Sequence, residues 1–562
     1  MSVRTFPPLD LAVPDRREWI VSRVLERRSQ TDGDRPFLEL LDQPALTYAE
    51  VDRRVNALAH GFRALGVTRG DRALVMLPNS IEFLLVWWAL NRLGAVEVPI
   101  NHAYKGYFLE HVVNNSGARV IVIASDLVER LQASEARLPE LETAVVHGGD
   151  DRLPGFARLR AIPFTELDTG RDDPPGVELS HRDLLAIMYT SGTTGPSKGV
   201  MMPNAHCHLF AELTANLTRL TQDDVYFVAT PLYHGNAPMM QVYPAMLRGG
   251  RAVVCPRFSA SEWADQIRRS GATVTNLLGV MMEFVFRQPE RPGDRDHRLR
   301  VALGQPAPAA IVEDFKRRFG IPRVLEYYGM TEIGIVTMMP WDDVRPGSCG
   351  VAVSEWFDLE IVDPETDEPR APGEVGELLV RPKAPWLFNQ GYWRMPDTTL
   401  EALRNVWYHT GDGLTRDADG YFSFVDRMRD VIRRRAVNIS SYDVERVVAD
   451  HEDVAECAAV AVPSGLPGGE DEIKLCLVLR AGATLDPEPF LAWCEDRMPY
   501  FAVPRYLEVL PALPRTPNDK VQKYRLRETG VAAAWDRVKA GYQLAEERKK
   551  AETRRRQRTQ RG

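Results

Sequence analysis

Residues 189–200 read YTSGTTGPSKGV, and they directly follow the apolar run LLAIM (184–188), which can end a buried strand. The small and hydroxyl-bearing residues of this stretch are Ser191, Gly192, Thr193, Thr194, Gly195 and Gly199. Glycines permit positive φ angles and a close approach of the backbone to a ligand, and hydroxyls can donate to phosphate oxygens. Successive backbone N–H groups in such a loop form an anion-binding nest, to which Lys198 adds a positive charge. The stretch therefore predicts a phosphate-binding loop at the end of a strand.

The loop differs from the Walker A pattern GxxxxGK[ST], because Lys198 is followed by Gly199 and Val200 rather than by a serine or threonine. The structural alternative is a polar loop that binds no ligand, and a composition of Gly, Ser and Thr alone does not distinguish the two. The complete twelve-residue string favours phosphate binding.

Strand-like and helix-like segments alternate from about residue 45 to residue 330. The apolar runs typical of buried strands are RALVML (72–77), ARVIVIA (118–124), DVYFVAT (224–230) and RAVVCP (251–256). Amphipathic segments such as residues 48–66 lie between them, and this alternation predicts an α/β fold with parallel sheets covered by helices. The most apolar long segment, residues 83–100, contains Asn91, Arg92 and Glu97. We therefore expect a buried helix followed by a strand there, and no membrane span.

The composition excludes several classes of protein. The chain has 562 residues, of which 44% are hydrophobic and 26% charged, as in soluble globular proteins of several domains. Its formal charge of -8, from 70 basic and 78 acidic residues, gives no general electrostatic reason to bind nucleic acid. Six cysteines without a CxxC pair suit free thiols in a reducing compartment, and the N-terminal residues lack a signal-peptide pattern. We therefore expect a cytoplasmic protein.

The pattern changes after about residue 345. Short β-like runs (FDLEIV, GELLV and GYFSFV) with many Gly and Pro residues predict a smaller, mostly antiparallel, β-rich module up to residue 428. After residue 429 a compact α+β pattern follows, with helices expected at 441–451 and 487–498 and a strand at 474–480. The predicted domains are a large N-terminal domain (1–428), a small C-terminal α+β domain (429–542) and a charged, disordered tail (543–562).

The loop at 189–200 resembles the phosphate-loop signature of the adenylate-forming (ANL) superfamily, which includes acyl-CoA synthetases, peptide-synthetase adenylation domains and firefly luciferases. Six further stretches resemble motifs of this family, in the family's order: TPLYHGNA (230–237), YYGMTE (327–332), GYWRMPDTT (391–399), YHTGD (408–412), DRMRDVIRRRAVNIS (426–440) and LPRTPNDKVQKYRLR (513–527). The resemblance spans nearly the whole chain. It implies the acid–thiol ligase branch, with ATP/AMP, Mg²⁺ and coenzyme A as cofactors and a mobile C-terminal domain.

The resemblance also implies which residues bind ATP. They are Thr190, Ser191, Gly192, Thr193, Thr194, Gly195, Lys198, Tyr328, Gly329, Asp412 and Arg427. In this family Tyr328 would give an aromatic face to adenine, and Asp412, helped by Arg427, would accept hydrogen bonds from the ribose. Thr331 would contact the α-phosphate, and Glu332 would ligate Mg²⁺, a hard cation that prefers oxygen ligands.

Two further catalytic residues follow from the resemblance. Lys520 would stabilise charge on the acid carboxylate and the α-phosphate during the first step. His234 would lie near the carboxylate and the thiol entry path, and a structural histidine is the alternative. The segment AHCHL (205–209) lacks zinc-ligand spacing, so we expect no metal site there.

The positions expected to line the acid pocket are Gly235, Leu278, Gly279, Gly304 and Met330. They are apolar or small, and the glycines are expected to leave room for a ligand, which predicts a bulky, mostly apolar acid. An amino acid would need a buried acidic partner for its ammonium group. The stretch GNAPMM (235–240) lacks the Asp that many amino-acid-activating relatives have there.

Three stretches depart from the family pattern. The expected hinge residue is Arg429, and Ala436 replaces a glycine that borders the thiol channel in the family, with Val437 after it. Asp519 precedes Lys520 where the family has glycine, and residues 304–308, which include Gln305, replace the Gly-Gly-Ala-Pro of the family's adenine loop. A methyl group at Ala436 would hinder domain closure, and the Asp519 carboxylate would oppose the triphosphate. The sequence thus leaves open whether both half-reactions survive.

We predict an AMP-forming acyl-CoA ligase that acts on a bulky, mostly apolar acid. The alternatives are an enzyme confined to thioesterification of a ready-made acyl-adenylate, an enzyme that loads a carrier-protein thiol, a non-catalytic nucleotide-binding protein and a luciferase-type oxygenase. The expected partners are the acid or its acyl-adenylate and coenzyme A. The sequence leaves open whether the protein is a monomer or a homodimer.

Overall fold

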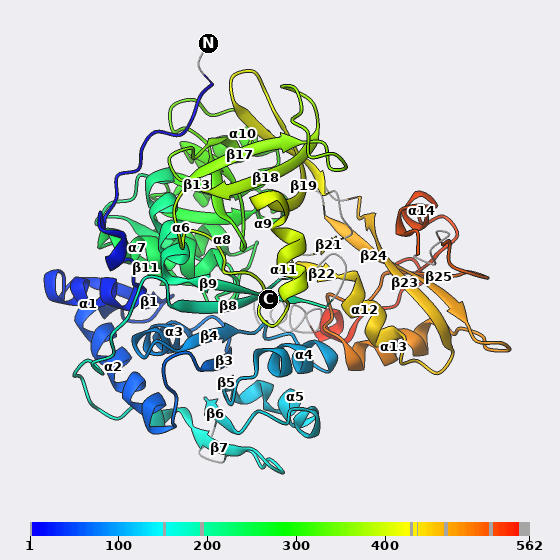
Figure 1. Cartoon of the computed structure of the whole chain (residues 1–562), viewed down its shortest axis with the longest axis horizontal. Helices are drawn as coiled ribbons and strands as arrows, with labels where there is room; N and C mark the ends of the chain where they lie inside the picture. Colours follow the sequence, from blue (N-terminus) through cyan, green and yellow to red (C-terminus); the bar gives the residue numbers. More distant parts are fainter. Residues whose placement is uncertain are drawn as a thin grey trace. The chain divides into compact units, whose positions relative to one another are not determined.

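The computed structural model describes residues 3–149, 153–190, 196–427, 431–434, 437–465, 470–515 and 521–549. The chain divides into two compact units. The first consists of Met1–His102, Val113–Tyr189 and Lys198–Met428, and the second of Ala103–Val112, Thr190–Ser197 and Arg429–Gly562. Figure 1 labels many of the helices and strands of both units.

A seven-stranded sheet forms one part of the first unit, in the order β7-β6-β5-β3-β4-β8-β9. Its strands are β3 (Arg72–Met76), β4 (Val96–Pro99), β5 (Val120–Ala124), β6 (Thr143–His147), β7 (Arg160–Pro163), β8 (Leu184–Thr190) and β9 (Lys198–Pro203). The pairs from β7 to β8 are parallel. The run LLAIM lies in β8 as expected, and the phosphate-loop stretch therefore joins the ends of β8 and β9.

A thirteen-stranded sheet forms the rest of the first unit, in the order β17-β18-β19-β20-β16-β15-β14-β13-β12-β10-β11-β1-β2. Its parallel half is β1 (Pro36–Leu40), β10 (Val225–Val228), β11 (Arg251–Val254), β12 (Val274–Leu278), β13 (Val301–Gln305) and β14 (Arg323–Met330), with β2 (Leu46–Thr47) antiparallel at the edge. Its antiparallel half is β15 (Gly334–Met338), β16 (Gly350–Ala352), β17 (Phe357–Val362), β18 (Gly376–Pro382), β19 (Tyr408–Arg416) and β20 (Tyr421–Arg427).

The two halves meet at β14, which pairs in parallel with β13 and antiparallel with β15. The antiparallel module expected from residue 345 onward is therefore confirmed, but it continues the parallel sheet instead of forming a separate one. The α/β fold class predicted from the sequence is confirmed.

The helices of the first unit follow their sequence signals. In α2 (Tyr48–Ala64), Thr47 and Glu50 form a reciprocal capping box at the N-terminus. The apolar segment around residue 83 forms α3 (Ile81–Arg92) followed by β4, and α3 is buried along nearly its whole length, as expected. The other helices are α1 (Val21–Thr31), α5 (Val128–Gln132), α6 (Asn204–Leu217), α7 (Tyr243–Arg248), α8 (Trp263–Ser270), α9 (Gly279–Phe286), α10 (Val312–Phe319) and α11 (Pro396–Ala402); α4 (Tyr107–Ser116) belongs to both units.

No helix in the described ranges is long and apolar enough to cross a membrane.

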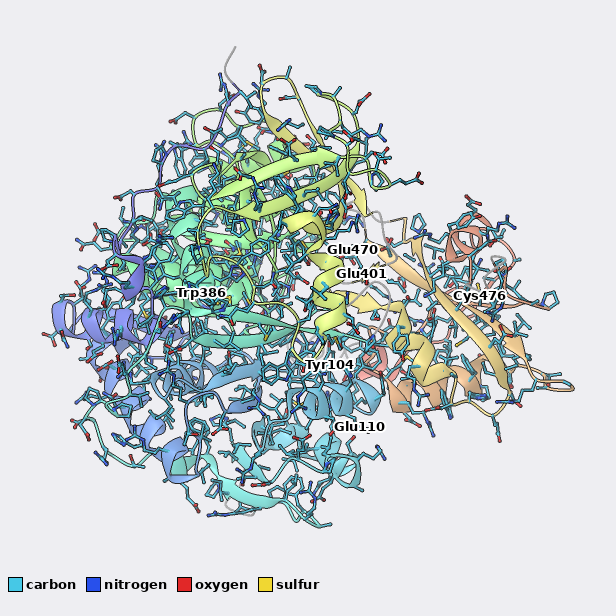
Figure 2. All side chains as sticks on the ribbon, in the orientation of Figure 1. Tyr104, Glu110, Trp386, Glu401, Glu470 and Cys476 are labelled. Carbon is cyan, nitrogen blue, oxygen red and sulfur yellow. The ribbon has the colours of Figure 1, made fainter. Side chains whose placement is uncertain are left out.

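The second unit contains the hairpin β21 (Val431–Arg434) and β22 (Val437–Ser440) and a four-stranded sheet β23-β24-β25-β26. These four strands are Val454–Pro463, Asp471–Leu479, Tyr506–Val509 and Trp535–Asp536, and the helices are α12 (Ser441–Val448), α13 (Pro487–Arg497) and α14 (Lys523–Glu528). Cys476, labelled in Figure 2, is buried on β24. All six cysteines of the chain are free.

The packed part of this unit extends past residue 542, where the charged tail was expected to begin. Leu544 is fully buried in the core, and the backbone N–H of Ala545 donates to Glu495 at 2.6 Å. Glu547 forms an ion pair with Arg537 at 2.8 Å. An apolar side chain and two charge-assisted contacts thus hold this stretch. Residues 550–562 lie outside the described part of the chain.

Candidate active site

Two predicted nucleotide residues contact each other directly. The hydroxyl of Tyr328, on β14, donates to Oδ2 of Asp412, on β19, at 2.7 Å. Both side chains are buried, and the ring of Tyr328 stacks on that of Phe424 with 6.4 Å between centroids. The pair offers an aromatic face beside a fixed carboxylate, which suits an adenine base attached to a ribose.

Irregular strand pairing positions Asp412. The register of β18 and β19 shifts between Glu377 and Leu379, and that of β19 and β20 shifts after Gly413. Glu377 accepts from the N–H of Gly411 at 2.8 Å, and the hydroxyl of Thr410 accepts from the N–H of Asp412 at 3.1 Å. Bulges of this kind redirect side chains at functional sites. Asp412 pairs with Arg427 across the two strands, but the side chain of Arg427 lies outside the described part.

The predicted magnesium ligand belongs to a second cluster. Glu332 is buried, and its Oε1 accepts from the hydroxyl of Tyr392 at 3.2 Å. The hydroxyls of Tyr392 and Tyr408 are 2.8 Å apart. Burial raises the pKa of Tyr408, and the negative charge of Glu332 adds to the rise. The ammonium group of Lys198 lies 5.1 Å from the ring centroid of Tyr392, within cation–π range.

Backbone pairing explains how Lys198 reaches this cluster. The segment after residue 389 runs beside β9: the N–H of Gln390 donates to the carbonyl of Met201, and the N–H of Trp393 donates to that of Gly199 at 2.7 Å. Two motifs almost two hundred residues apart in sequence, 189–200 and 391–399, are joined in this way. A carboxylate, two phenols and an ammonium group thus lie together.

Sequence reasoning missed the residues that fix Thr331 and Glu332. The ring nitrogens of His206 lie 3.0 Å from the carbonyl oxygens of Thr331 and Leu387, and the side-chain amide of Asn389 donates to the carbonyl of Glu332 at 2.7 Å. His206 belongs to the AHCHL segment considered for a metal. Its second histidine, His208, contacts the hydroxyl of Tyr243 instead, so the two rings serve different parts of the core.

Several predicted residues lie outside the described part of the chain. They are Ser191, Gly192, Thr193, Thr194, Gly195, Arg429, Ala436 and Lys520. The ends of the phosphate-loop stretch are described, because Thr190 ends β8 and Lys198 begins β9.

On the acid side, a short loop carries His234. The Asn79 side chain holds this loop by accepting from the N–H of Leu232 at 2.8 Å and donating to the carbonyl of Thr230 at 3.0 Å. The N–H of Asn236 donates to Nδ1 of His234 at 3.3 Å, which puts the proton of a neutral imidazole on Nε2. His234 is exposed. The structure therefore presents an oriented imidazole at this position.

The predicted pocket glycines differ in what surrounds them. A Cβ added at Gly279 would lie 2.5 Å from the carbonyl oxygen of Pro306, and one at Gly304 would lie 2.7 Å from the Cβ of Ala307. Protein atoms already fill these positions, so the reading of both glycines as empty space is wrong. At Gly235 a Cβ would meet, among the described residues, the sulfur atoms of Met188 and Met239, at 3.3 and 3.7 Å.

Leu278 and Met330 are half-buried at the ends of β12 and β14. At Gly329 a Cβ would lie 2.4 Å from the carbonyl oxygen of Gly334, so the close approach of β14 and β15 requires glycine there.

A hollow of about 350 Å³ lies elsewhere in the first unit, between residues 3–5 and strands β17 to β19. Charges of both signs line it, including the pair Arg381–Asp358 at 2.9 Å. It includes none of the predicted site residues.

Comparison with known proteins assigns the chain to a family. Residues 25–393 match the model of the AMP-binding enzymes, and residues 443–520 match that of the AMP-binding enzyme C-terminal domain. The crotonobetaine/carnitine–CoA ligase of Salmonella agona (strain SL483) is 31% identical over 490 residues, which cover 86% of this chain and 93% of the relative.

Solved structures agree with this assignment. ATP-bound MatB from Rhodopseudomonas palustris is 26% identical, with a TM-score of 0.66 over 91% of this chain and 98% of its own. A double mutant of o-succinylbenzoate CoA synthetase (MenE) from Bacillus subtilis shares the fold at 23% identity, with a TM-score of 0.76 over 91% and 98%. The chain belongs to the AMP-binding enzymes, and within them to the AMP-forming acid–CoA ligases.

Proposed function

We propose that the chain activates a bulky, mostly apolar carboxylic acid and transfers it to coenzyme A. First, a carboxylate oxygen of the acid attacks the α-phosphorus of ATP, the bond to pyrophosphate breaks, and an acyl-adenylate forms. Then the sulfur of coenzyme A attacks the acyl carbon, the bond to the AMP oxygen breaks, and the thiol proton passes to solvent. Such chemistry depends on positioning and on neutralising phosphate charge, and it needs no nucleophilic side chain.

The proposal rests mainly on one short segment, residues 328–332, which takes part in two separate contacts. Within five residues, Tyr328 bonds to Asp412 and Glu332 bonds to Tyr392 beside Lys198. The first contact suits adenine and ribose. The second combines a carboxylate with a cation, which suits a metal-bound phosphate chain.

We assign the charged groups as follows. Lys198 and the backbone of residues 190–195 hold the outer phosphates, Thr331 contacts the α-phosphate, and Lys520 stabilises charge in the first step. The buried carboxylate of Glu332 fits Mg²⁺, which binds through one or two carboxylates together with phosphate oxygens. When bound, the ion would neutralise charge on ATP. His234 orients the acid near the thiol.

The apolar character assigned to the acid rests on methionines around Gly235. The sulfur atoms of Met188 and Met239 flank this glycine, and both side chains are buried. Methionine side chains are adaptable and fit irregular apolar ligands.

We further propose that residues 1–428 form the adenylation domain and that residues 429–542 form the core of a mobile C-terminal domain. Arg429 would be the hinge, and Ala436 would border the thiol channel. After adenylation, rotation about such a hinge would move Lys520 out of the active site and let coenzyme A enter for the second step. The free cysteines suit a reducing compartment, which is why we assign the enzyme to the cytoplasm.

A panel of acids, with AMP and acyl-CoA formation measured separately, tests the proposal. We expect pyrophosphate exchange into ATP and acyl-CoA formation with the same acids. If the enzyme made acyl-CoA from a supplied acyl-adenylate but showed no pyrophosphate exchange, it would catalyse thioesterification alone. The carboxylate of Asp519 would favour this outcome, because it would oppose binding of the triphosphate. Adenylation without transfer to free coenzyme A would indicate a carrier-protein acceptor. If no acid supported either pyrophosphate exchange or acyl-CoA formation, the proposal would be refuted.

A further inference from the structure

A chain of hydrogen bonds links six neutral side chains where strands β10, β12, β13 and β14 approach the predicted acid site. They are Tyr226, Asn236, Gln241, Asn276, Gln305 and Tyr327. All except Gln305, which is half-buried, are at most 4% exposed. An apolar interior would stabilise the fold at least as well, because buried polar groups contribute little net stability even when they are bonded.

Asn236 is the centre of this network. Its Oδ1 accepts from the side-chain amides of Gln241 at 2.6 Å and Asn276 at 3.2 Å. Its Nδ2 donates to the hydroxyl of Tyr327 at 3.0 Å. On the far side, the hydroxyl of Tyr226 donates to Asn276 at 2.6 Å. These bonds fix the direction in which each amide points.

The network reaches the edge of the core at Gln305. The Tyr327 hydroxyl donates to Oε1 of Gln305 at 2.6 Å, and Nε2 of Gln305 donates to the carbonyl of Gly329 at 3.4 Å. The second bond is longer than the usual range for N–H···O bonds. Gln305 therefore presents an oriented amide on the half-buried side of the network.

One member is not satisfied. Among the described residues, Oε1 of Gln241 has no hydrogen-bond partner, although the side chain is fully buried. A buried acceptor without a partner is unfavourable, and its presence in a native structure calls for an explanation. Gln241 lies in a π-helical turn, Pro238–Val242, and such turns occur frequently at functional sites.

The network adjoins the pocket glycine that is not packed against the backbone, because Asn236 follows Gly235. Gln305 is the last residue of β13. β10, β12 and β13 are parallel neighbours, and ligands of open α/β sheets bind beyond the carboxyl ends of such strands. Gln305 also bonds to Gly329, so the network ends beside the residues predicted to bind the nucleotide.

We propose that this network is the polar end of the acid pocket and that the acid carries a neutral hydrogen-bonding group, a hydroxyl, which Gln305 binds at the end remote from the carboxylate. The inference rests on the proposed function and narrows its substrate class from a bulky apolar acid to a bulky ω-hydroxylated or aryl-hydroxylated acid. The six side chains are uncharged, so they offer no counter-charge to a second carboxylate or to a quaternary ammonium group. A quaternary ammonium group also has no N–H to donate.

The test compares acids that differ only in this group. Octanoate is compared with 8-hydroxyoctanoate, and 3-phenylpropanoate with its 4-hydroxy analogue, with crotonobetaine as the charged probe. For the full-length enzyme we expect kcat/KM for acyl-CoA formation to favour each hydroxylated acid about tenfold or more over its partner. We expect crotonobetaine to be a poorer substrate than either hydroxylated acid.

Two variants remove the recognition without adding charge. Gln305→Met keeps the length of the side chain, and Tyr327→Phe removes only the hydroxyl that orients Gln305; each should reduce the preference to about threefold or less. The preference should return in part in Gln305→Glu at low pH, where a protonated carboxyl can donate. Tyr48→Phe is the control, because it deletes another buried hydroxyl, bonded to the carbonyl of Gly250 at 2.7 Å, outside the network. It should leave the preference unchanged.

Equal kcat/KM for hydroxylated and unsubstituted acids in the wild type would overturn the inference while the proposed function stands. A preference that persists in both Gln305→Met and Tyr327→Phe, or a better use of crotonobetaine, would also overturn it. The absence of both pyrophosphate exchange and acyl-CoA formation with every acid would refute the proposed function itself.

Discussion

The Tyr328 hydroxyl lies 2.7 Å from the Asp412 carboxylate, although four strand spacings separate β14 from β19 in the order of the sheet. In a flat sheet, strands about 4.8 Å apart would hold these positions about 19 Å from each other. The contact therefore requires the antiparallel half of the sheet to curl. The register shifts after Tyr328 and after Gly413 supply local bends of this kind. Curvature of the sheet, rather than local sequence, brings the two residues together.

Tyr328→Phe should weaken AMP binding. The phenylalanine ring retains the aromatic face for adenine, but the Asp412 carboxylate loses the donor that orients it, and a hydrogen bond to a charged group contributes about 1.5–3 kcal/mol. We expect the Kd for AMP, measured by calorimetry, to rise about tenfold. Tyr48→Phe should leave the Kd unchanged. A Kd within about twofold of the wild type for Tyr328→Phe would show that the hydroxyl does not organise the ribose site.

Tyr392→Phe should change the magnesium dependence of adenylation. The Tyr392 hydroxyl bonds to Glu332, and loss of such an outer partner of a metal ligand typically costs about 10–100-fold in metal affinity. We expect the Mg²⁺ concentration for half-maximal pyrophosphate exchange to rise about tenfold. Acyl transfer from a supplied acyl-adenylate should be unaffected. An unchanged Mg²⁺ titration would remove Glu332 from the metal site.

Local patterns predicted the elements that carry the site, because apolar runs and amphipathic segments follow from the geometry of strands and helices. The run LLAIM became β8, and residues 224–230 contain β10. The contacts of Tyr392 and His206 could not be predicted, because they depend on pairing between segments far apart in sequence. Their motifs were visible, but neither side chain had a role that its neighbours in sequence revealed.

Glycines show a second limit of sequence reasoning. Gly279 and Gly304 were read as open space for a ligand, but they are glycines because backbone or side-chain atoms pack directly against them. A sequence does not distinguish room for a ligand from room for the protein itself. Leu544 is a similar case, because one apolar side chain in a charged segment was enough to anchor it.

Lys520→Ala should abolish adenylation and spare thioester formation from a supplied acyl-adenylate. The reason is that the lysine would stabilise phosphate charge only in the first step, where the loss of one such donor costs about 10²–10³ in rate. Pyrophosphate exchange and thioester formation measure the two steps separately. Adenylation at the wild-type rate would show that the assignment of Lys520 is wrong.

The Glu326 carboxyl should make stability depend on pH. Burial raises its pKa from 4.5 to about 7, and the N–H groups of Ala307 and Gly347, which donate to it, oppose the rise. Because the folded pKa is the higher one, the folded protein binds the extra proton. The resulting stability is fully present below pH 4.5 and is lost as the pH rises through about 7.

We expect the free energy of unfolding, measured in urea, to fall by up to about 3 kcal/mol between pH 5 and pH 8 through this group. Glu326→Gln keeps an oxygen for the N–H of Ala307 and cannot ionise, so its profile should be flatter over this range. Parallel profiles for wild type and variant would show that Glu326 does not titrate there.

Gly235 and Gly279 form a matched pair of positions that separates acid selectivity from stability. At Gly279 a new Cβ would overlap the backbone oxygen of Pro306, so that Gly279→Ala must shift the main chain; overpacking of this kind costs about 1–3 kcal/mol. We expect the Tm of Gly279→Ala to fall by several degrees and kcat/KM to fall by a similar factor for acids of every length.

At Gly235 the nearest atoms are sulfur atoms of two methionines, which can move aside. Gly235→Val should therefore keep a Tm close to that of the wild type while it lowers kcat/KM for long acids about tenfold more than for short ones. If Gly235→Val lowered kcat/KM by the same factor for acids of every length, the acid would not bind beside this glycine. The methionines around it would then be ordinary core residues.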